Sequence, residues 1–164
     1  MILFKFRMLS DENDHFLREF EIASSATLLE LHHFITEILE YEEAITSFFT
    51  ADDMWERLTE YTVVDMGDAA AQPMASTALS DALKRVHDRL IYMFDIFENR
   101  AYYLELVEVS AAEKETKYPR EIFAHATPPD QYDANANIED GSIFDEMMDG
   151  FSDFDESDGY DDEY

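Results

Sequence analysis

Residues 27–39, with the sequence TLLELHHFITEIL, carry the strongest secondary-structure signal in the chain and decide the class of fold. Thr27 lies three residues before Glu30, the spacing of a capping box, in which each side chain accepts a hydrogen bond from the other residue's backbone N–H. Large apolar residues then recur at helical spacing and form one stripe, at Leu28, Leu31, Phe34, Ile35, Ile38 and Leu39. This pattern predicts an amphipathic helix that packs one side on a core. His32 falls at the edge of the stripe, so we expect a packed or hydrogen-bonded imidazole there.

Acidic residues gather at the end of this helix, at Glu37, Glu40, Glu42 and Glu43. The carboxyl end of a helix carries a partial negative charge, so carboxylates are electrostatically unfavourable at this place. The pattern indicates that acidity is required there for some other reason.

Two segments with strand-like alternation precede the helix. Residues 2–9 place apolar side chains on one face and Lys5 and Arg7 on the other, and residues 16–22 alternate in the same way. The polar run between these segments predicts a hairpin. After the helix we predict short strands at residues 46–50 and 62–64, a loop at 67–76, a short helix at 79–87, and a second hairpin from residues 89–97 and 101–109. Beyond Ser110 the chain is charged and then interrupted by prolines, and no strand is predicted there. The elements together predict an α+β fold in a single domain.

Composition limits the classes of partner. The 164 residues include 39 acids and 11 bases, a formal net charge of −28. Such a surface repels phosphate backbones and anionic lipid, because affinity for both depends on cationic side chains. We therefore expect no direct nucleic-acid or membrane contact, and a basic protein surface is the natural complement.

The chain has no cysteine, which excludes disulfides, thiolate zinc sites and thiol catalysis. The first residues, MILFKFRML, are too short an apolar run for a signal peptide and are interrupted by charges. No apolar run approaches the roughly 18–20 residues that cross a bilayer. The expected location is the cytoplasm.

The last part of the chain is the most acidic. Residues 131–164 hold 13 acids and no base, which places a domain at residues 1–130 and a tail at 131–164. From Ser142 onward, large apolar residues fall on one side of a helical projection and acids on the other. We predict a tail that is disordered or conditionally helical and that lays its apolar side in a groove of a basic partner. The predicted partner-binding residues are Phe144, Asp145, Met147, Met148, Phe151, Phe154 and Asp155. Two alternatives stay open: a solvated tail that only aids solubility, and a helix that docks on its own domain.

The sequence matches several catalytic and metal-binding motifs only in part or not at all. The raw material for a histidine–carboxylate site is His32, His33, His87, Asp95 and Glu98, but no HExxH spacing occurs. Gly67 is the only glycine of residues 1–130, so no glycine-rich phosphate loop is present, and the Gly-x-Ser-x-Gly elbow is missing. An EF-hand-like run near Asp153 has Asp158 where glycine is needed and Tyr164 where glutamate is needed. We therefore predict no cofactor and no metal site.

Several short motifs, in matching order, resemble the family typified by the third open reading frame of the Ri plasmid, whose members are also called passenger or TnpR-like proteins of insertion elements. TLLELHHFI carries the family's Leu-His pair at Leu31 and His32. LIYMFDIFEN, residues 90–99, falls on its hallmark strand, and YPREIFAHATPPD, residues 118–130, resembles its closing segment. The resemblance spans nearly all of residues 2–130 and none of the tail. It implies an α+β fold with an antiparallel sheet and packed helices, and no established activity.

The chain departs from the family pattern at several polar positions. Phe97 replaces the hallmark glycine and Glu98 is the acid that follows it, Arg100 and Tyr102 occupy the tryptophan and histidine positions, and Ile45 replaces another histidine. If these positions form a polar site elsewhere in the family, this chain retains His32, Tyr92 and Asp95 of it. We take these three residues as the candidate ligand site.

Three functions remain open. The first is a non-enzymatic interaction protein whose acidic amphipathic tail binds a basic partner, such as a nucleic-acid-binding protein whose site it mimics or shields. The second is a small enzyme or ligand-binding domain that uses the His/Tyr/Asp site. The third is a mobile-element-associated protein that acts on DNA, which the net charge disfavours.

Overall fold

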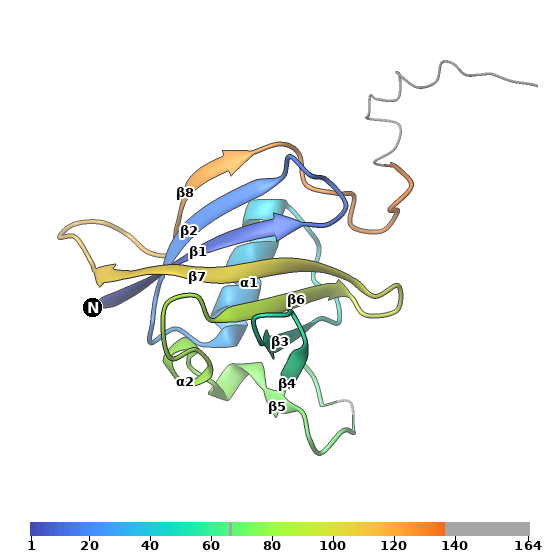
Figure 1. Ribbon diagram of the computed structural model, residues 1–164, viewed down its shortest axis with the longest axis horizontal. Helices are drawn as coiled ribbons and strands as arrows, with labels where there is room; N and C mark the ends of the chain where they lie inside the picture. Colours follow the sequence, from blue (N-terminus) through green and yellow to red (C-terminus); the bar gives the residue numbers. More distant parts are fainter. Residues whose placement is uncertain (66, 137–164) are drawn as a thin grey trace, which may run out of the picture. The chain divides into compact units, whose positions relative to one another are not determined.

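The structure is a computed structural model that describes residues 1–65 and 67–136. Its elements, in chain order, are β1 (Ile2–Ser10), β2 (Leu17–Ala23), α1 (Leu28–Leu39), β3 (Ser47–Ala51), β4 (Arg57–Thr62), β5 (Gln72–Pro73), the 3-10 turn η1 (Met74–Ser76), α2 (Leu79–Ala82), β6 (Arg89–Asp95), β7 (Arg100–Ala111) and β8 (Arg120–His125) (Figure 1). One sheet contains all eight strands in the order β5-β4-β3-β6-β7-β1-β2-β8. Every neighbouring pair is antiparallel except β4 and β5. The predicted α+β class with an antiparallel sheet is confirmed.

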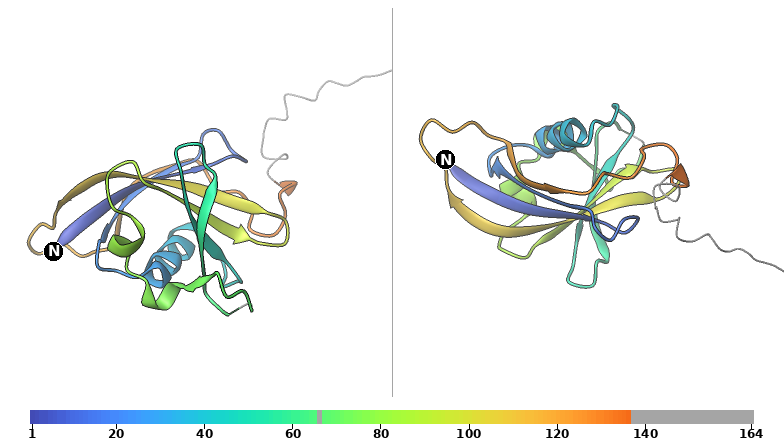
Figure 2. Two further views of the ribbon diagram at one scale, coloured as in Figure 1. Left: turned by 60° about the horizontal axis from the view of Figure 1, so that its bottom comes forward. Right: turned by 90° about the horizontal axis from the view of Figure 1, so that it is seen from above.

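The core lies between α1 and one face of the sheet, and Figure 2 shows α1 on that face. Strand β1 sits between β2 and β7, and its alternation buries Phe4, Phe6 and Met8 toward the helix. Helix α1 buries most of its apolar stripe against them, and the rings of Phe20 and Phe34 meet with centroids 5.2 Å apart. A smaller cluster of buried residues, centred on β6 and β7, lies apart from this core.

The ends of α1 follow from local chemistry. The Thr27 backbone N–H donates to the Glu30 carboxylate at 2.9 Å, and the Glu30 N–H donates to the Thr27 hydroxyl at 3.1 Å, so the predicted capping box is confirmed. At the other end, Glu40 adopts the left-handed conformation with φ 60° and stops the helix. The chain then runs without regular structure to β3.

Two predicted elements have different limits in the structure. The helix predicted at 79–87 ends after Ala82, because the Asp88 carboxylate accepts the backbone N–H groups of Lys84 and Arg85 and holds a turn there. The strand predicted at 62–64 is Arg57–Thr62, since the Asp52 carboxylate binds the N–H groups of Met54 and Glu56 and closes a tight turn before it. Hydrogen bonds to nearby carboxylates therefore explain why the helix and the strand have other limits than those predicted.

The region beyond Ser110 contains an edge strand, β8, that the sequence analysis did not predict. Five of its six side chains are exposed, so it lacks the apolar alternation that identifies a half-buried strand. Its partner β2 is linked to it by Arg18, whose guanidinium donates to the carbonyl oxygens of His125 and Ala126 at 2.9 Å each. The predicted loop at 67–76 likewise contains β5 and η1, with Met74 buried.

Truncating Phe20 should identify the core directly. Phe20→Ala removes a fully buried ring that contacts both β1 and α1, and it should lower the free energy of unfolding by about 3–5 kcal/mol in urea titrations. Phe97→Ala is the matched control, because that ring is 80% exposed, and it should change the free energy by less than about 0.5 kcal/mol. Equal losses in both variants would contradict this assignment of the core.

Candidate functional site at a buried histidine

His32 is the polar residue that α1 places inside the core. Its side chain is fully buried, and both ring nitrogens have partners from other parts of the chain. Nδ1 lies 2.7 Å from the Tyr92 hydroxyl on β6 and 3.2 Å from the Thr46 hydroxyl. Nε2 lies 2.9 Å from one carboxylate oxygen of Glu43 and 3.2 Å from the other. The expectation of a hydrogen-bonded imidazole is met, as a buried polar group requires.

The partners of His32 fix where its proton lies. An ionised carboxylate only accepts hydrogen bonds, so Nε2 carries the proton that Glu43 receives. Nδ1 then accepts from the Tyr92 hydroxyl, whose pKa is raised by burial and which therefore keeps its proton. Burial lowers the pKa of His32, and the hydrogen bond that His32 donates to Glu43 opposes that effect without cancelling it. The imidazole is therefore neutral near pH 7.

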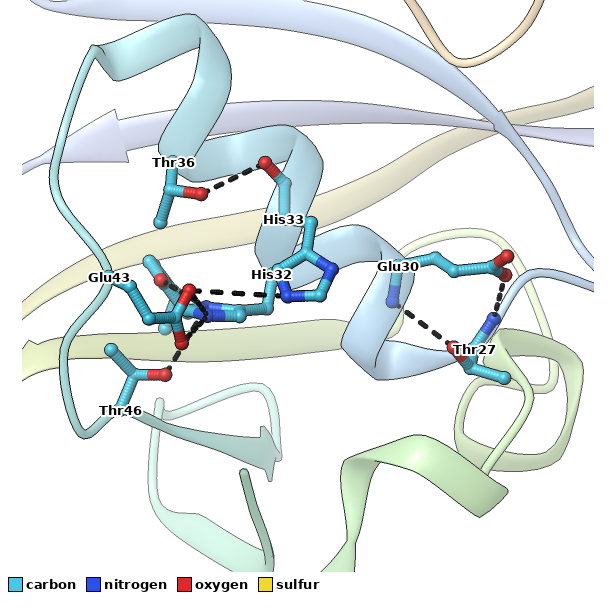
Figure 3. Close-up of polar contacts among 8 residues, drawn as sticks. Thr27, Glu30, His32, His33, Thr36, Glu43 and Thr46 are labelled. Atoms are coloured by element: carbon cyan, nitrogen blue, oxygen red, sulfur yellow. Dashed lines mark hydrogen bonds and ion pairs between the residues drawn. The ribbon is translucent and has the colours of Figure 1, made fainter. Parts of the chain in front are cut away.

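His33 and Glu43 extend the buried site to the surface. Both side chains are 58% exposed, and His33 Nε2 lies 4.0 Å from a carboxylate oxygen of Glu43. Figure 3 shows the imidazoles of His32 and His33 directed toward the Glu43 carboxylate, from adjacent positions on α1. One ligand atom from each of the three residues lies within 4.8 Å of the others. The site thus combines one fixed, buried nitrogen with two adjustable groups at its mouth.

A cavity of about 590 Å³ lies beside His33. Glu30, His33, Phe34 and Glu37 form its α1 wall, and Tyr118 and Pro119 contribute to another wall. This volume falls in the range of small-molecule sites. His33 therefore belongs both to the cavity and to the group around Glu43.

The structure brings together two of the three predicted ligand-site residues. His32 and Tyr92 are hydrogen-bonded, but Asp95 lies at the end of β6, where its carboxylate accepts the backbone N–H groups of Phe97 and Glu98. Asp95 thus closes the β6–β7 turn in place of facing the imidazole. Of the other histidine candidates, His33 joins the site and His87 pairs with Glu105 at 2.7 Å. The predicted partner-binding residues, Phe144 to Asp155, lie outside the described residues.

Glu43 and Thr46 are the members that sequence reasoning missed. The signal for Glu43 was present, because the acids after α1 are unfavourable for the helix, and one of them binds the imidazole. Thr46 gave no comparable signal. Its hydroxyl reaches His32 because the chain turns back under the helix after Glu40.

Two of the positions at which the chain departs from the family pattern, Arg100 and Tyr102, are buried and belong to a packed network. Tyr102 is fully buried and its hydroxyl lies 2.5 Å from that of Tyr41. Arg100 donates to both carboxylate oxygens of Glu12, at 2.8 and 2.9 Å, and its guanidinium lies over the Phe94 ring at 4.7 Å. These residues hold the β1–β2 turn against β6 and β7.

The fold and site define a small α+β domain in which one helix crosses an antiparallel sheet and carries a buried histidine. The chain belongs to the family of plasmid pRiA4b ORF-3-like proteins, which matches residues 4–157. The resemblance was expected to cover residues 2–130 and none of the tail; that limit was wrong, because the match to residue 157 takes in most of the acidic segment.

A solved structure shares the fold. It is that of a protein of unknown function from Methanosarcina mazei, with a TM-score of 0.71 and 14% identity over 91% of this chain and 84% of that one. No curated protein matches the chain. Within the described residues, no helix is long and apolar enough to cross a membrane. The comparisons thus give the family and the fold, and the family has no known function.

The protonation of His32 predicts a pH dependence of stability. The unfolded imidazole titrates near its ordinary pKa of about 6.5, whereas the folded one resists protonation, so acid favours the unfolded chain. The free energy of unfolding of the wild type, minus that of His32→Gln, should therefore fall between about pH 7.5 and about pH 5.5. Urea titrations across this pH range measure this difference in the free energy of unfolding. The contributions of the acidic residues that both proteins contain cancel in it. A difference that grows in acid would show that the folded protein holds an imidazolium.

Proposed function

We propose that this protein is a non-enzymatic interaction protein that binds a basic surface of a partner protein through its acidic C-terminal segment, residues 131–164. The observation that carries the proposal is the composition of that segment, with 13 acids, no base and a stripe of large apolar residues. Acids alone would serve solubility, whereas exposed phenylalanine and methionine oppose it. A surface that is both positive and grooved would accommodate both features.

The charge of the folded part supports the proposal. Residues 1–130 hold 26 acids and 11 bases. Six of those bases form ion pairs within the described residues, namely Lys5 with Glu108, Arg7 with Glu19, Arg18 with Glu121, Arg85 with Asp88, Arg100 with Glu12 and Arg120 with Glu21. Arginine and lysine side chains that are paired in this way are poorly placed to bind phosphates. The acids of residues 1–130 still outnumber the bases. The folded part therefore adds to the attraction for a cationic partner.

The class of partner follows from this charge. Proteins that bind nucleic acids present clustered arginine and lysine, and those clusters attract carboxylates by the same electrostatics. An acidic segment with apolar anchors would occupy such a site and shield it. The same surplus of negative charge disfavours a direct action on DNA. This holds even though the chain resembles a family whose members are also called proteins of insertion elements.

A second candidate function is ligand binding by the folded domain. The observation in its favour is the convergence of His32, His33 and Glu43, of which His33 also lines a cavity. These residues differ from the predicted ligand site of His32, Tyr92 and Asp95, because the carboxylate beside His32 is that of Glu43 and not that of Asp95.

The proposal predicts that apolar anchors and salt both control binding. Partners captured by the full chain would be identified, and the dissociation constant of the purified complex measured at low and moderate salt. Replacing Phe144, Phe151 and Phe154 by serine in the full chain should weaken binding at least roughly tenfold, because desolvated aromatic residues dominate interface energies. Wild-type binding should weaken steeply with salt.

Tyr160→Ser with Tyr164→Ser is the matched control, because it removes aromatic side chains of the same segment outside the stripe. This control should bind like the wild type. If the phenylalanine variant keeps the partners, affinity and salt dependence of the wild type, the proposed role of the segment is wrong.

A further inference from the structure

We propose that His32, His33 and Glu43 bind a divalent transition-metal ion, and that Zn²⁺ is the ion that the site accommodates best. The three residues offer two imidazole nitrogens and a carboxylate oxygen, all within 4.8 Å of one another. Two histidines and a glutamate form a ligand set that zinc uses in proteins. The inference is independent of the proposed role of the acidic segment.

The distances require only small adjustments. Ligands about 2.0–2.2 Å from a tetrahedral ion lie roughly 3.4 Å from one another. His32 Nε2 and Glu43 are 2.9 Å apart and would open slightly, whereas His33 Nε2 and Glu43 are 4.0 Å apart and would close. The two groups that must move are the exposed ones, so a rotation of each side chain suffices. His32 stays fixed by the core.

The partners of His32 Nδ1 suit a metal on Nε2. A metal ion takes the Nε2 lone pair, so the imidazole proton must sit on Nδ1 and needs an acceptor. The hydroxyls of Tyr92 and Thr46, at 2.7 and 3.2 Å from Nδ1, can turn and accept it. The same hydroxyls donate or accept according to the state of the site. Metal binding would therefore exchange the tautomer of His32 without leaving a buried polar atom unsatisfied.

The surroundings also favour a metal. The side chains of His33 and Glu43 are both 58% exposed, so an ion would have access from solvent, and a water could take a fourth position. Imidazole donors favour zinc, cobalt or nickel over calcium and magnesium, which prefer oxygen ligands alone.

Zinc titration of the full chain tests the proposal. Calorimetry in a large excess of Mg²⁺, which occupies the loose carboxylate sites, should show one Zn²⁺ bound per chain. Glu43→Gln and His33→Ala should each weaken that binding at least tenfold, and both residues are exposed, so the fold should survive. His32→Gln should abolish the binding.

His87→Ala is the matched control. His87 also pairs with a carboxylate, that of Glu105, at 2.7 Å, but among the described residues no second histidine joins this pair. Its zinc affinity should equal that of the wild type. The visible spectrum of bound Co²⁺ supplies an independent readout of four-coordinate geometry. Unchanged zinc affinity in Glu43→Gln and His33→Ala, or no one-to-one binding in the wild type, would overturn the proposal. A loss confined to His32→Gln would also overturn it, because it would report damage to the fold.

Discussion

One polar side chain constrains the packing of this protein. His32 lies where α1 crosses the sheet, among aromatic and aliphatic residues, and a buried imidazole without partners would cost several kcal/mol, on the order of 1–3 per unmet hydrogen bond. Its Nδ1 is hydrogen-bonded to Tyr92 on β6 and to Thr46, the residue before β3. Its Nε2 is hydrogen-bonded to Glu43. The imidazole thus ties the helix to the sheet and also to the connection between α1 and β3. That connection could otherwise move independently of the helix.

This constraint explains how a structural residue also makes a site. The sequence places a second histidine next to the first, and the chain returns under the helix so that Glu43 meets both. The buried imidazole cannot move, whereas His33 and Glu43 can. A rigid donor flanked by adjustable ones is a common basis for ligand binding, because the fixed group bears little entropy cost when the ligand arrives. Elsewhere the fold uses its bases to pair with its own acids, which leaves a negatively charged exterior.

Local patterns predicted the fold wherever a short stretch determined the structure. The capping box and stripe gave α1, and alternation gave β1, β2 and the β6–β7 hairpin. Long-range or exposed features escaped. Strand β8 is recognised only through its pairing with β2, and α2 is cut short by the side chain of Asp88. Likewise, the hydrogen bond of His32 with Tyr92 joins residues far apart in the chain. A register shift between Met93 and Asp95 directs the Asp95 side chain to the β6–β7 turn. The spacing of residues along the sequence predicts neither the hydrogen bond nor the register shift.

In the metal-free protein His32 is a neutral imidazole whose Nε2 proton faces Glu43 and whose Nδ1 accepts a hydrogen bond from Tyr92. A long-range proton–nitrogen NMR spectrum of the labelled full chain, recorded with a chelator near neutral pH, reports the state of each ring nitrogen. We expect a protonated Nε2 and an unprotonated Nδ1 for His32. An imidazolium, or a proton on Nδ1 in the metal-free protein, would contradict this assignment.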